Sequence, residues 1–381
     1  MFIRRHLPLH TAAVLLAGVL AGGLAAGCAS TSAGNLDAAQ VARELRDRGL
    51  DPAAVVIPYE LTDEMREWAR SVVPEDTDPE KRLEVLLAGL VDADKLKVAY
   101  EPRYTATAQE VFQTRRANCL AFTSLFVGMA REVGIPAFFL DVDDVERFEK
   151  EGDLVVVSGH VSAGYGTGPV IKILDFSASP EANYRRVHRI SDLTAIALFH
   201  SNRGGELLRL GKHDEALPWL HKAVMIDPEL PGAWINYGVA RRRSGDFVGA
   251  EEAYRKALEV DPHAVSAYQN LAALLRRQGK QQEAEDLMAL SGTLGSRNPF
   301  IYLSLGDLSL AHGRFEEARR FYKRAMRLHR DSAEPYAAMG IAALASGDPG
   351  EAMRWMRKAV SIDQENQRVK LLVARLGGKR G

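Results

Sequence analysis

The sequence predicts an α+β domain in the first half of the chain and an all-α solenoid of paired helices in the second half. Three observations support this prediction. A cysteine stands at the start of an apolar helix near residue 119. Runs rich in β-branched residues follow between residues 137 and 177. After residue 190 only helix signals continue, and small residues recur every 34 positions, as in helical repeat proteins.

The composition is that of a globular protein of two or three domains. The chain has 381 residues, of which 46% are hydrophobic and 26% are charged. Its 49 Lys and Arg residues nearly balance its 50 Asp and Glu residues, so the formal net charge is −1. Most nucleic-acid-binding domains carry a basic excess, so the balance argues against a nucleic-acid partner.

The N-terminal residues have the pattern of an export signal. Arg4 and Arg5 precede an apolar run at Ala12–Leu20, and small residues lead from there to Cys28. The order Leu24-Ala25-Ala26-Gly27-Cys28 resembles the lipobox of bacterial lipoproteins, in which the cysteine becomes the lipidated first residue. The family usually has Leu three places before the cysteine, where this chain has Ala.

This resemblance predicts a signal peptide at residues 1–27, lipidation of Cys28, and a tether at residues 28–36. An uncleaved membrane anchor is the alternative, but the apolar run is shorter than the roughly 20 residues that a span needs. No Asp follows the cysteine. By resemblance to the proteobacterial sorting rule, this implies an outer-membrane lipoprotein facing the periplasm.

Four helices are expected before the cysteine segment. Two amphipathic patterns predict helices at Asp37–Arg48 and Leu61–Val73. Asp78 followed by Pro predicts an N-cap and a third helix that runs through Leu90. The pattern Thr107-x-x-Glu110 is a capping box for a short fourth helix.

Cys119 stands where a polar segment gives way to an apolar helix that ends at Gly134-Ile135-Pro136. The apolar spacing predicts a helix that buries one face. A thiol in the first helical turn lies at the positive end of the helix dipole, which favours the thiolate. If Cys28 carries lipid, Cys119 is the one free thiol of the mature chain.

The segment after Pro136 is predicted to form β-structure. Ala137–Val142 is expected to be a strand, and residues 143–153 a loop or a short surface helix. Leu154–Tyr165 and Val170–Ser177 are predicted to pair as a hairpin. If residues 166 and 169 close the hairpin loop, His160 and Asp175 lie directly opposite each other on one face, about 5 Å apart at Cβ.

These segments resemble the transglutaminase-like superfamily of papain-like thiol folds over about residues 60–180, within a predicted domain at residues 37–190. The residues that carry the resemblance are Asn118-Cys119-Leu120, Arg131-Glu132-Val133-Gly134-Ile135-Pro136, Ser158-Gly159-His160-Val161 and Leu174-Asp175-Phe176. The chain departs from the family at Ala117, where Gly is usual, and at Val161, where an aromatic residue is usual.

The resemblance implies a Cys-His-Asp thiol site. Cys119 would attack an amide or ester carbonyl, His160 would move the proton, and Asp175 would orient the imidazole. The backbone N–H of Cys119 and the side chains of Tyr104 and Gln113 are candidates for stabilising the oxyanion. No cofactor is implied, and the sequence shows no cluster of metal ligands.

The second half of the chain resembles the tetratricopeptide (TPR) repeat. Five repeats are predicted within residues 191–366, with starts near residues 197, 231, 265, 299 and 333, and a capping helix and tail at residues 367–381. The 34-residue period is carried by Gly204, Gly238, Gly306 and Gly340, by Ala216, Ala250, Ala284, Ala318 and Ala352, and by Gly211, Gly245, Gly279, Gly313 and Gly347 in the turns.

Arrays of this kind usually bind a protein or peptide on their inner helices. The candidate groove residues are Asn236, Arg242, Asn270, Arg276 and Arg277. The Asn side chains are suited to hydrogen-bond an extended backbone, and the Arg side chains to bind acidic ligands. Solvated side chains without a ligand are the alternative.

Three functions are therefore expected from the sequence. The first is a membrane-anchored thiol enzyme that acts on amide bonds, either a peptidase or amidase or an acyl transferase, with a TPR array that binds a protein partner or substrate. The second is a catalytically inactive envelope scaffold that acts through the TPR array alone. The third is a transglutaminase proper, which joins Gln and Lys side chains. Hydrolysis and transfer share one thioester intermediate and differ in whether water or an amine attacks it.

Overall fold

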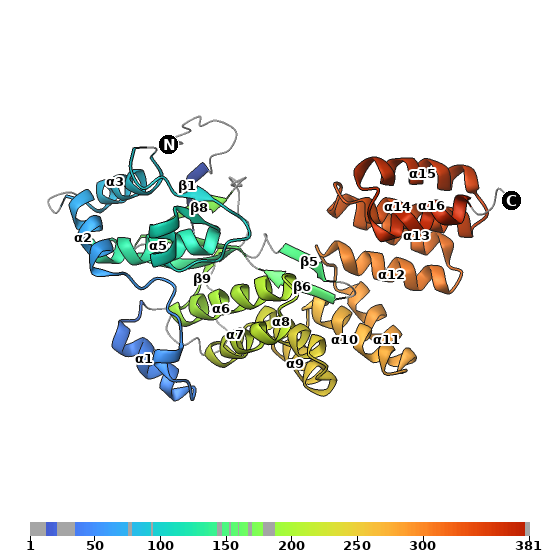
Figure 1. Cartoon of the computed structure of the whole chain (residues 1–381), viewed down its shortest axis with the longest axis horizontal. Helices are drawn as coiled ribbons and strands as arrows, with labels where there is room; N and C mark the ends of the chain where they lie inside the picture. Colours follow the sequence, from blue (N-terminus) through green and yellow to red (C-terminus); the bar gives the residue numbers. More distant parts are fainter. Residues whose placement is uncertain are drawn as a thin grey trace. The chain divides into compact units, whose positions relative to one another are not determined.

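The computed structural model describes residues 13–20, 35–74, 78–92, 94–142, 147–151, 154–158, 160–166, 170–177 and 187–377 (Figure 1). The predicted lipidation site at Cys28 and most of the predicted signal peptide lie outside these residues. The chain forms two compact units. Residues 1–147 and 158–240 form the first unit, and residues 148–157 and 241–381 form the second.

A five-stranded antiparallel sheet forms the β part of the first unit, with strand order β1-β8-β7-β4-β9. Its strands are β1 (Ala13–Leu20), β4 (Ala137–Val142), β7 (Val161–Tyr165), β8 (Val170–Ser177) and β9 (Val187–Arg189). The short strands β2 (Ala99–Tyr100) and β3 (Arg116–Ala117) pair separately in parallel. Strand β1 lies within the segment that the lipoprotein prediction assigns to the signal peptide.

The helices before the sheet are α1 (Ala38–Asp47), the 3-10 turn η1 (Pro52–Ala54), α2 (Asp63–Val72), α3 (Pro79–Val91), α4 (Ala108–Thr114) and α5 (Cys119–Glu132). Two of them, α3 and α4, begin at the predicted caps. Asp78 caps α3 through the N–H groups of Glu80 and Lys81. Thr107 and Glu110 form the predicted capping box of α4. These local signals suffice because a cap satisfies N–H groups within its own first turn.

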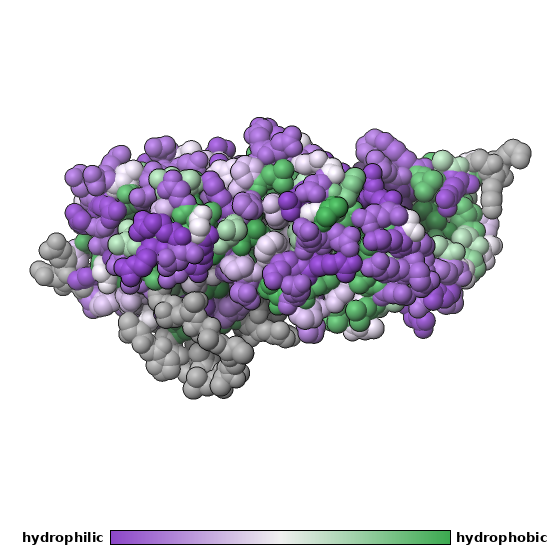
Figure 2. All heavy atoms as spheres, turned by 90° about the horizontal axis from the view of Figure 1, so that it is seen from below, coloured by the Kyte–Doolittle hydropathy of each residue, from purple (hydrophilic) through white to green (hydrophobic). Residues whose placement is uncertain are grey.

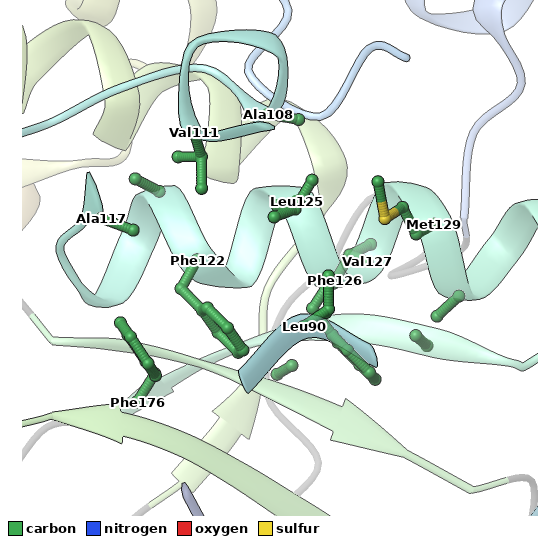
Figure 3. Close-up of a cluster of buried hydrophobic side chains, with 14 of the residues drawn as sticks. Leu90, Ala108, Val111, Ala117, Phe122, Leu125, Phe126, Val127, Met129 and Phe176 are labelled. Atoms are coloured by element: carbon green, nitrogen blue, oxygen red, sulfur yellow. The ribbon is translucent and has the colours of Figure 1, made fainter. Parts of the chain in front are cut away.

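Helix α5 is the centre of the first unit. It contacts β4, β7 and β8 of the sheet as well as the helices α2, α3 and α4. Phe122 of α5 stacks on Phe176 of β8, with ring centroids 3.9 Å apart (Figure 3). All residues from Cys119 to Ala130 are buried, so the prediction that this helix buries one face was wrong. Layers on two sides leave it no exposed face.

The β-region differs from the prediction in two places. The run Leu154–Tyr165 is divided into β6 (Leu154–Ser158) and β7, which belong to different sheets. Residues Arg147–Glu151, expected in a loop or surface helix, form strand β5, which pairs with β6. Strand formation by this charged segment depends on its partner strand, which local propensity does not report.

Paired helices follow from residue 192 onward, which confirms the all-α solenoid. The helices are α6 (Asp192–Arg209), α7 (His213–Ile226), α8 (Pro231–Arg243), α9 (Phe247–Val260), α10 (Val265–Arg277), α11 (Gln281–Thr293), α12 (Pro299–Ala311), α13 (Phe315–Leu328), α14 (Ala333–Ala345), α15 (Pro349–Ile362) and α16 (Gln367–Gly377). Helices α8, α10, α12 and α14 begin at the residues where the 34-residue period places repeat starts. The first pair begins earlier, because Ser191 caps α6.

The recurring glycines have two different roles. The five turn glycines, including Gly211 and Gly313, have φ between 72° and 87°, a left-handed conformation that favours glycine. The glycines inside helices allow close packing instead. A Cβ atom at Gly306 would lie 2.3 Å from the Tyr322 ring, and one at Gly204 would lie 2.4 Å from Leu220.

Much of the molecular face seen in Figure 2 is hydrophilic, with apolar residues in separate small groups. Exposed large apolar side chains are scattered, with Leu210 and Val248 the most exposed of them. Among the described residues, no helix combines the length and apolar character needed to cross a membrane.

Candidate active site

The start of α5 places the candidate nucleophile. Asn118 is the N-cap, and its Oδ1 accepts a hydrogen bond from the Ala121 N–H at 2.9 Å. Cys119 is therefore the first helical residue, as predicted. Its side chain is 9% exposed. Its backbone N–H lies in the first turn, at the positive end of the helix dipole.

His160 and Asp175 form a buried pair at the sheet. His160 Nε2 and Asp175 Oδ1 lie 2.7 Å apart, and the two side chains are only 4% and 2% exposed. The same imidazole is also hydrogen-bonded to Cys119. A carboxylate on one ring nitrogen orients the imidazole and stabilises its cation.

The predicted register of these strands was wrong by two residues. Ala163 pairs with Leu174 and Tyr165 with Lys172, so Ser162, not His160, lies opposite Asp175. His160 is instead the diagonal neighbour of Asp175. A shift of two residues keeps the same side chains on the same face, so the contact survives the error. Residues 167–169 of the predicted hairpin loop lie outside the described residues.

Ser162 is a member of this cluster that the sequence reasoning missed. Its Oγ lies 3.4 Å from His160 Nε2 and 3.5 Å from Asp175 Oδ1, and the side chain is fully buried. A signal was present, because residues two apart on a strand share a face. Ser162 supplies a second polar contact that holds the pair in place.

Two opposing effects set the pKa of His160. Burial lowers it, because desolvation disfavours the charged ring. Hydrogen bonds to Asp175 and Cys119, together with the charges of both groups, outweigh burial and raise the pKa to about 10. The ring is therefore protonated at neutral pH. A protonated imidazole beside a thiol favours the thiolate.

A polar network from α6 supports the residue before Cys119. Asn118 Nδ2 donates to Thr105 Oγ1 at 2.9 Å, and the Thr105 N–H donates to Glu206 Oε1 at 2.7 Å. Arg203 Nη1 donates to the Thr105 carbonyl at 2.9 Å. The first repeat helix thus fixes the loop that holds the N-cap. No local signal predicts this network, because about 100 residues separate its members.

The two predicted oxyanion side chains have different surroundings. The Tyr104 carbonyl accepts a hydrogen bond from the Asn118 N–H at 3.3 Å, so its backbone lies beside the start of α5. The Tyr104 ring lies under the Arg116 guanidinium, 4.9 Å away. Gln113 is exposed on α4, and in the described part of the chain its side chain makes no hydrogen bond. Tyr104 is the better placed of the two.

The predicted groove residues do not form one cluster. Asn270 is fully buried and binds the backbone of Val155 in β6 through both its amide atoms. Asn236 is also buried, and its Nδ2 donates to Ser201 Oγ at 3.2 Å. Arg242 is buried, whereas Arg276 and Arg277 are exposed at the end of α10.

The described part of the chain contains no candidate metal centre. No set of three or more His, Cys, Asp or Glu side chains there is arranged to hold a metal ion. Two histidines of the repeats face single carboxylates, His263 at Asp261 and His312 at Glu285.

Family comparisons identify both parts of the chain. A model of the transglutaminase-like superfamily matches residues 66–140. Models described as tetratricopeptide repeat match residues 197–222, 231–264, 253–286 and 309–376. The chain therefore contains a transglutaminase-like domain and several TPR repeats. The transglutaminase-like match includes Cys119 and ends before His160 and Asp175.

Three solved structures illustrate the similarity of the chain to known folds. The structure of the APC/C hetero-tetramer Cut9-Hcn1 is 19% identical, covers 48% of this chain and 36% of its own, and has a TM-score of 0.42. The structure of pilF from Pseudomonas aeruginosa is 24% identical, with 47% and 82% covered and a TM-score of 0.41. A thermophilic TPR protein of Thermus thermophilus is 21% identical, with 46% and 95% covered and a TM-score of 0.38. A comparison with curated proteins found no match.

Proposed function

We propose that the chain is a thiol enzyme that acts on amide bonds through Cys119, His160 and Asp175, and that its repeats bind a protein partner or substrate. The observation that carries the proposal is the buried His160–Asp175 contact of 2.7 Å, with Cys119 hydrogen-bonded to the same imidazole. The transglutaminase-like match around Cys119 supports the same chemistry. The TPR repeats support protein binding.

In the acylation step, the Cys119 thiolate attacks the carbonyl carbon of an amide and forms a tetrahedral oxyanion. The imidazolium of His160 then gives its proton to the leaving nitrogen. The C–N bond breaks, an amine leaves, and a thioester remains on Cys119. Asp175 stabilises the imidazolium before this proton is transferred.

In the second step, His160 takes a proton from the incoming nucleophile, which attacks the thioester carbonyl. Water gives a carboxylic acid, and a primary amine gives a new amide. The thiolate is the leaving group in both cases, and the imidazolium is restored. Peptidase or amidase activity and acyl transfer therefore need the same residues and differ in which nucleophile reaches the thioester.

Stabilisation of the oxyanion is assigned to the start of α5. The N–H of Cys119 points from the positive end of the helix, where developing negative charge is stabilised. Tyr104, whose backbone is bonded to Asn118, is the side chain proposed to assist.

An inactive scaffold is the second candidate, and the low exposure of the site favours it. Cys119 is 9% exposed and His160 3%, so a substrate carbonyl has little surface through which to approach the thiol. In this case the polar cluster would serve the stability of the domain, and the TPR repeats would supply the function.

Thiol reactivity measured against pH decides between the two candidates. The chain from Ala29 onward, in which Cys119 is the one cysteine, is labelled with iodoacetamide between pH 5 and 9, and the modification of Cys119 is followed by intact mass. The variants are His160→Ala and the matched control His188→Ala. His188 also faces a carboxylate on the sheet, Asp141 at 3.7 Å, but is 53% exposed.

Fast labelling well below pH 8 that is slowed by His160→Ala and not by His188→Ala supports the enzyme. The pH dependence of an ordinary thiol, unaffected by either substitution, would leave the scaffold as the function. Incubation of the active protein with a dansylated primary amine and a glutamine-containing peptide then separates acyl transfer from hydrolysis.

The membrane anchor is a separate part of this proposal. Lipidation at Cys28 is supported by the sequence pattern around it. It is tested by expression in a Gram-negative host with the parent and Cys28→Ser. Recovery of the parent in the outer-membrane fraction, and of the variant outside it, is the expected result. Equal fractionation of the two proteins would exclude the anchor.

A further inference from the structure

Asn270, on the face of α10 that the repeat prediction assigns to a ligand groove, already binds a strand of the same chain. Asn270 of α10 accepts a hydrogen bond from the Val155 N–H at 2.8 Å and donates one to the Val155 carbonyl at 2.9 Å. Leu154 and Val155 are fully buried, and Val156 is 2% exposed. Strand β6, apart from its last residue Ser158, belongs with α10 to the second unit.

Strand β6 lies in a long insertion between β4 and β7. Strands β4 and β7 are antiparallel neighbours, with Asp141 paired to Val161. Such neighbours can be joined by a turn of two residues. Here 18 residues lie between Val142 and Val161, and they include β5 and β6. The insertion is not needed to close the sheet, and it brings β6 into contact with Asn270 of α10.

Asn270 hydrogen-bonds to the backbone of β6 and not to a side chain. One amide group offers a donor and an acceptor, which match the C=O and N–H of a single residue in an extended chain. Any extended segment presents the same two groups. The side chains of β6 that are buried are aliphatic, two of them β-branched. If β6 left, both buried atoms of Asn270 would need a replacement partner.

We propose that this groove is a binding site for an extended apolar segment of a partner protein, and that β6 is its built-in occupant. A partner segment with aliphatic residues and a free backbone N–H competes with β6 for Asn270. Binding of the partner therefore requires release of β6 from the groove.

The exchange acts on the candidate thiol site through the chain itself. Strand β6 ends at Ser158, and one residue separates it from His160. Release of β6 frees the segment that leads into His160 and weakens the His160–Asp175 contact. Partner binding then lowers the reactivity of Cys119. This consequence rests on the proposed thiol function, whereas the peptide site does not.

The peptide site is tested by fluorescence anisotropy with a labelled peptide of residues 150–158, Lys-Glu-Gly-Asp-Leu-Val-Val-Val-Ser. The titrated proteins are the full mature chain, its Val155→Pro variant, and Val155→Pro combined with Asn270→Ala. Proline removes the N–H that β6 gives to Asn270. A tethered segment competes at an effective concentration of about 1 mM, so its release is expected to raise peptide affinity about tenfold or more.

Addition of Asn270→Ala is expected to abolish that gain. Equal peptide affinity of the parent and Val155→Pro, or a gain that persists with Asn270→Ala, would overturn the proposal. If Val155→Pro does not fold by circular dichroism, a second variant replaces residues 147–156 with a four-residue Gly-Ser linker. That variant must show the same gain, because it removes the occupant and keeps the groove.

The link to His160 is tested by iodoacetamide labelling of the parent with saturating peptide. The control is the same peptide with Pro at the position of Val155. The first peptide is expected to slow labelling severalfold and the control peptide not at all. Unchanged labelling by a peptide that binds would overturn the link. An ordinary thiol pH profile without peptide would instead mark failure of the proposed enzyme, and the anisotropy result would stand apart from it.

Discussion

We expect Asp192→Asn to destabilise the first unit strongly, because Asp192 forms a buried ion pair with Arg131. Arg131 Nη1 donates to Asp192 Oδ2 at 2.9 Å and Nη2 donates to Oδ1 at 2.8 Å. The side chains are 18% and 2% exposed. Arg131 also donates to the Ala137 carbonyl, so it joins the end of α5 to the starts of β4 and α6. Asp192→Asn keeps the shape of the side chain and removes its charge.

The expected loss of unfolding free energy follows from the unpaired charge of Arg131 that Asp192→Asn leaves in the folded chain. Removing one partner of a buried ion pair costs about 3–5 kcal/mol, because the other charge stays buried without compensation. Arg131 retains some contact with water, so we expect the lower end, about 3 kcal/mol of unfolding free energy. One of the two guanidinium hydrogen bonds is also lost, because an amide nitrogen cannot accept it.

The assay is urea unfolding followed by tryptophan fluorescence, which reports mainly on the first unit. Three of the four tryptophans, Trp68, Trp219 and Trp234, lie in that unit. The control is Glu84→Gln, in an exposed pair with Lys81 at 3.3 Å, for which a change below about 0.5 kcal/mol is expected. If Asp192→Asn costs no more than this control, the bidentate contact does not stabilise the unit and the reasoning is refuted.

Three further predictions concern pH and packing. Asp175→Asn is expected to lower the free energy of unfolding most below pH 6.5. The raised pKa of His160 gives the parent extra stability there, and this stability is lost as the pH rises through about 10. Urea midpoints of parent and variant that stay equally far apart from pH 6 to 10 would contradict this prediction. Burial lowers the pKa of His200 to about 4, so about 3 kcal/mol of stability is expected to be lost as the pH falls from 6.5 to 4, and His200→Gln should flatten the pH profile of the unfolding free energy. Gly306→Ala is expected to lower the free energy of unfolding by about 1–2 kcal/mol, because its Cβ would overlap the buried Tyr322 ring. The control is Gly232→Ala, whose Cβ has open space, so thermal unfolding should show no change or a gain of about 0.5 kcal/mol.

The elements that the sequence predicted well are those whose signals are local. Asp78 and Thr107 cap helices through N–H groups within three residues of themselves. The 34-residue period placed Gly211 and its equivalents in turns, where their φ angles are positive. Cys119 at the first helical position followed from the change from polar to apolar residues at Asn118.

The candidate site was predicted in composition and only partly in geometry. Alternation along a strand identifies which residues share a face, so His160 and Asp175 were expected together. It does not identify which residue lies opposite which, because registers that differ by two residues have the same alternation. The observed register adds Ser162 to the cluster.

Long-range contacts account for what the sequence did not reveal. Nothing near Thr105 indicates that Glu206 accepts its N–H, and nothing near Arg147–Glu151 indicates a strand. Each depends on a partner from a distant segment, so neighbouring residues in the sequence do not indicate it.

The sequence by itself determined the helices, the repeat period, the two domain types and the residues of the candidate thiol site. The tertiary structure decided the strand register, the complete burial of α5 and the occupant of the repeat groove. The reason is physical. Caps and periodic faces are satisfied within one or two turns, whereas Asn270 meets Val155 across 115 residues, where only the folded chain brings a donor and an acceptor together.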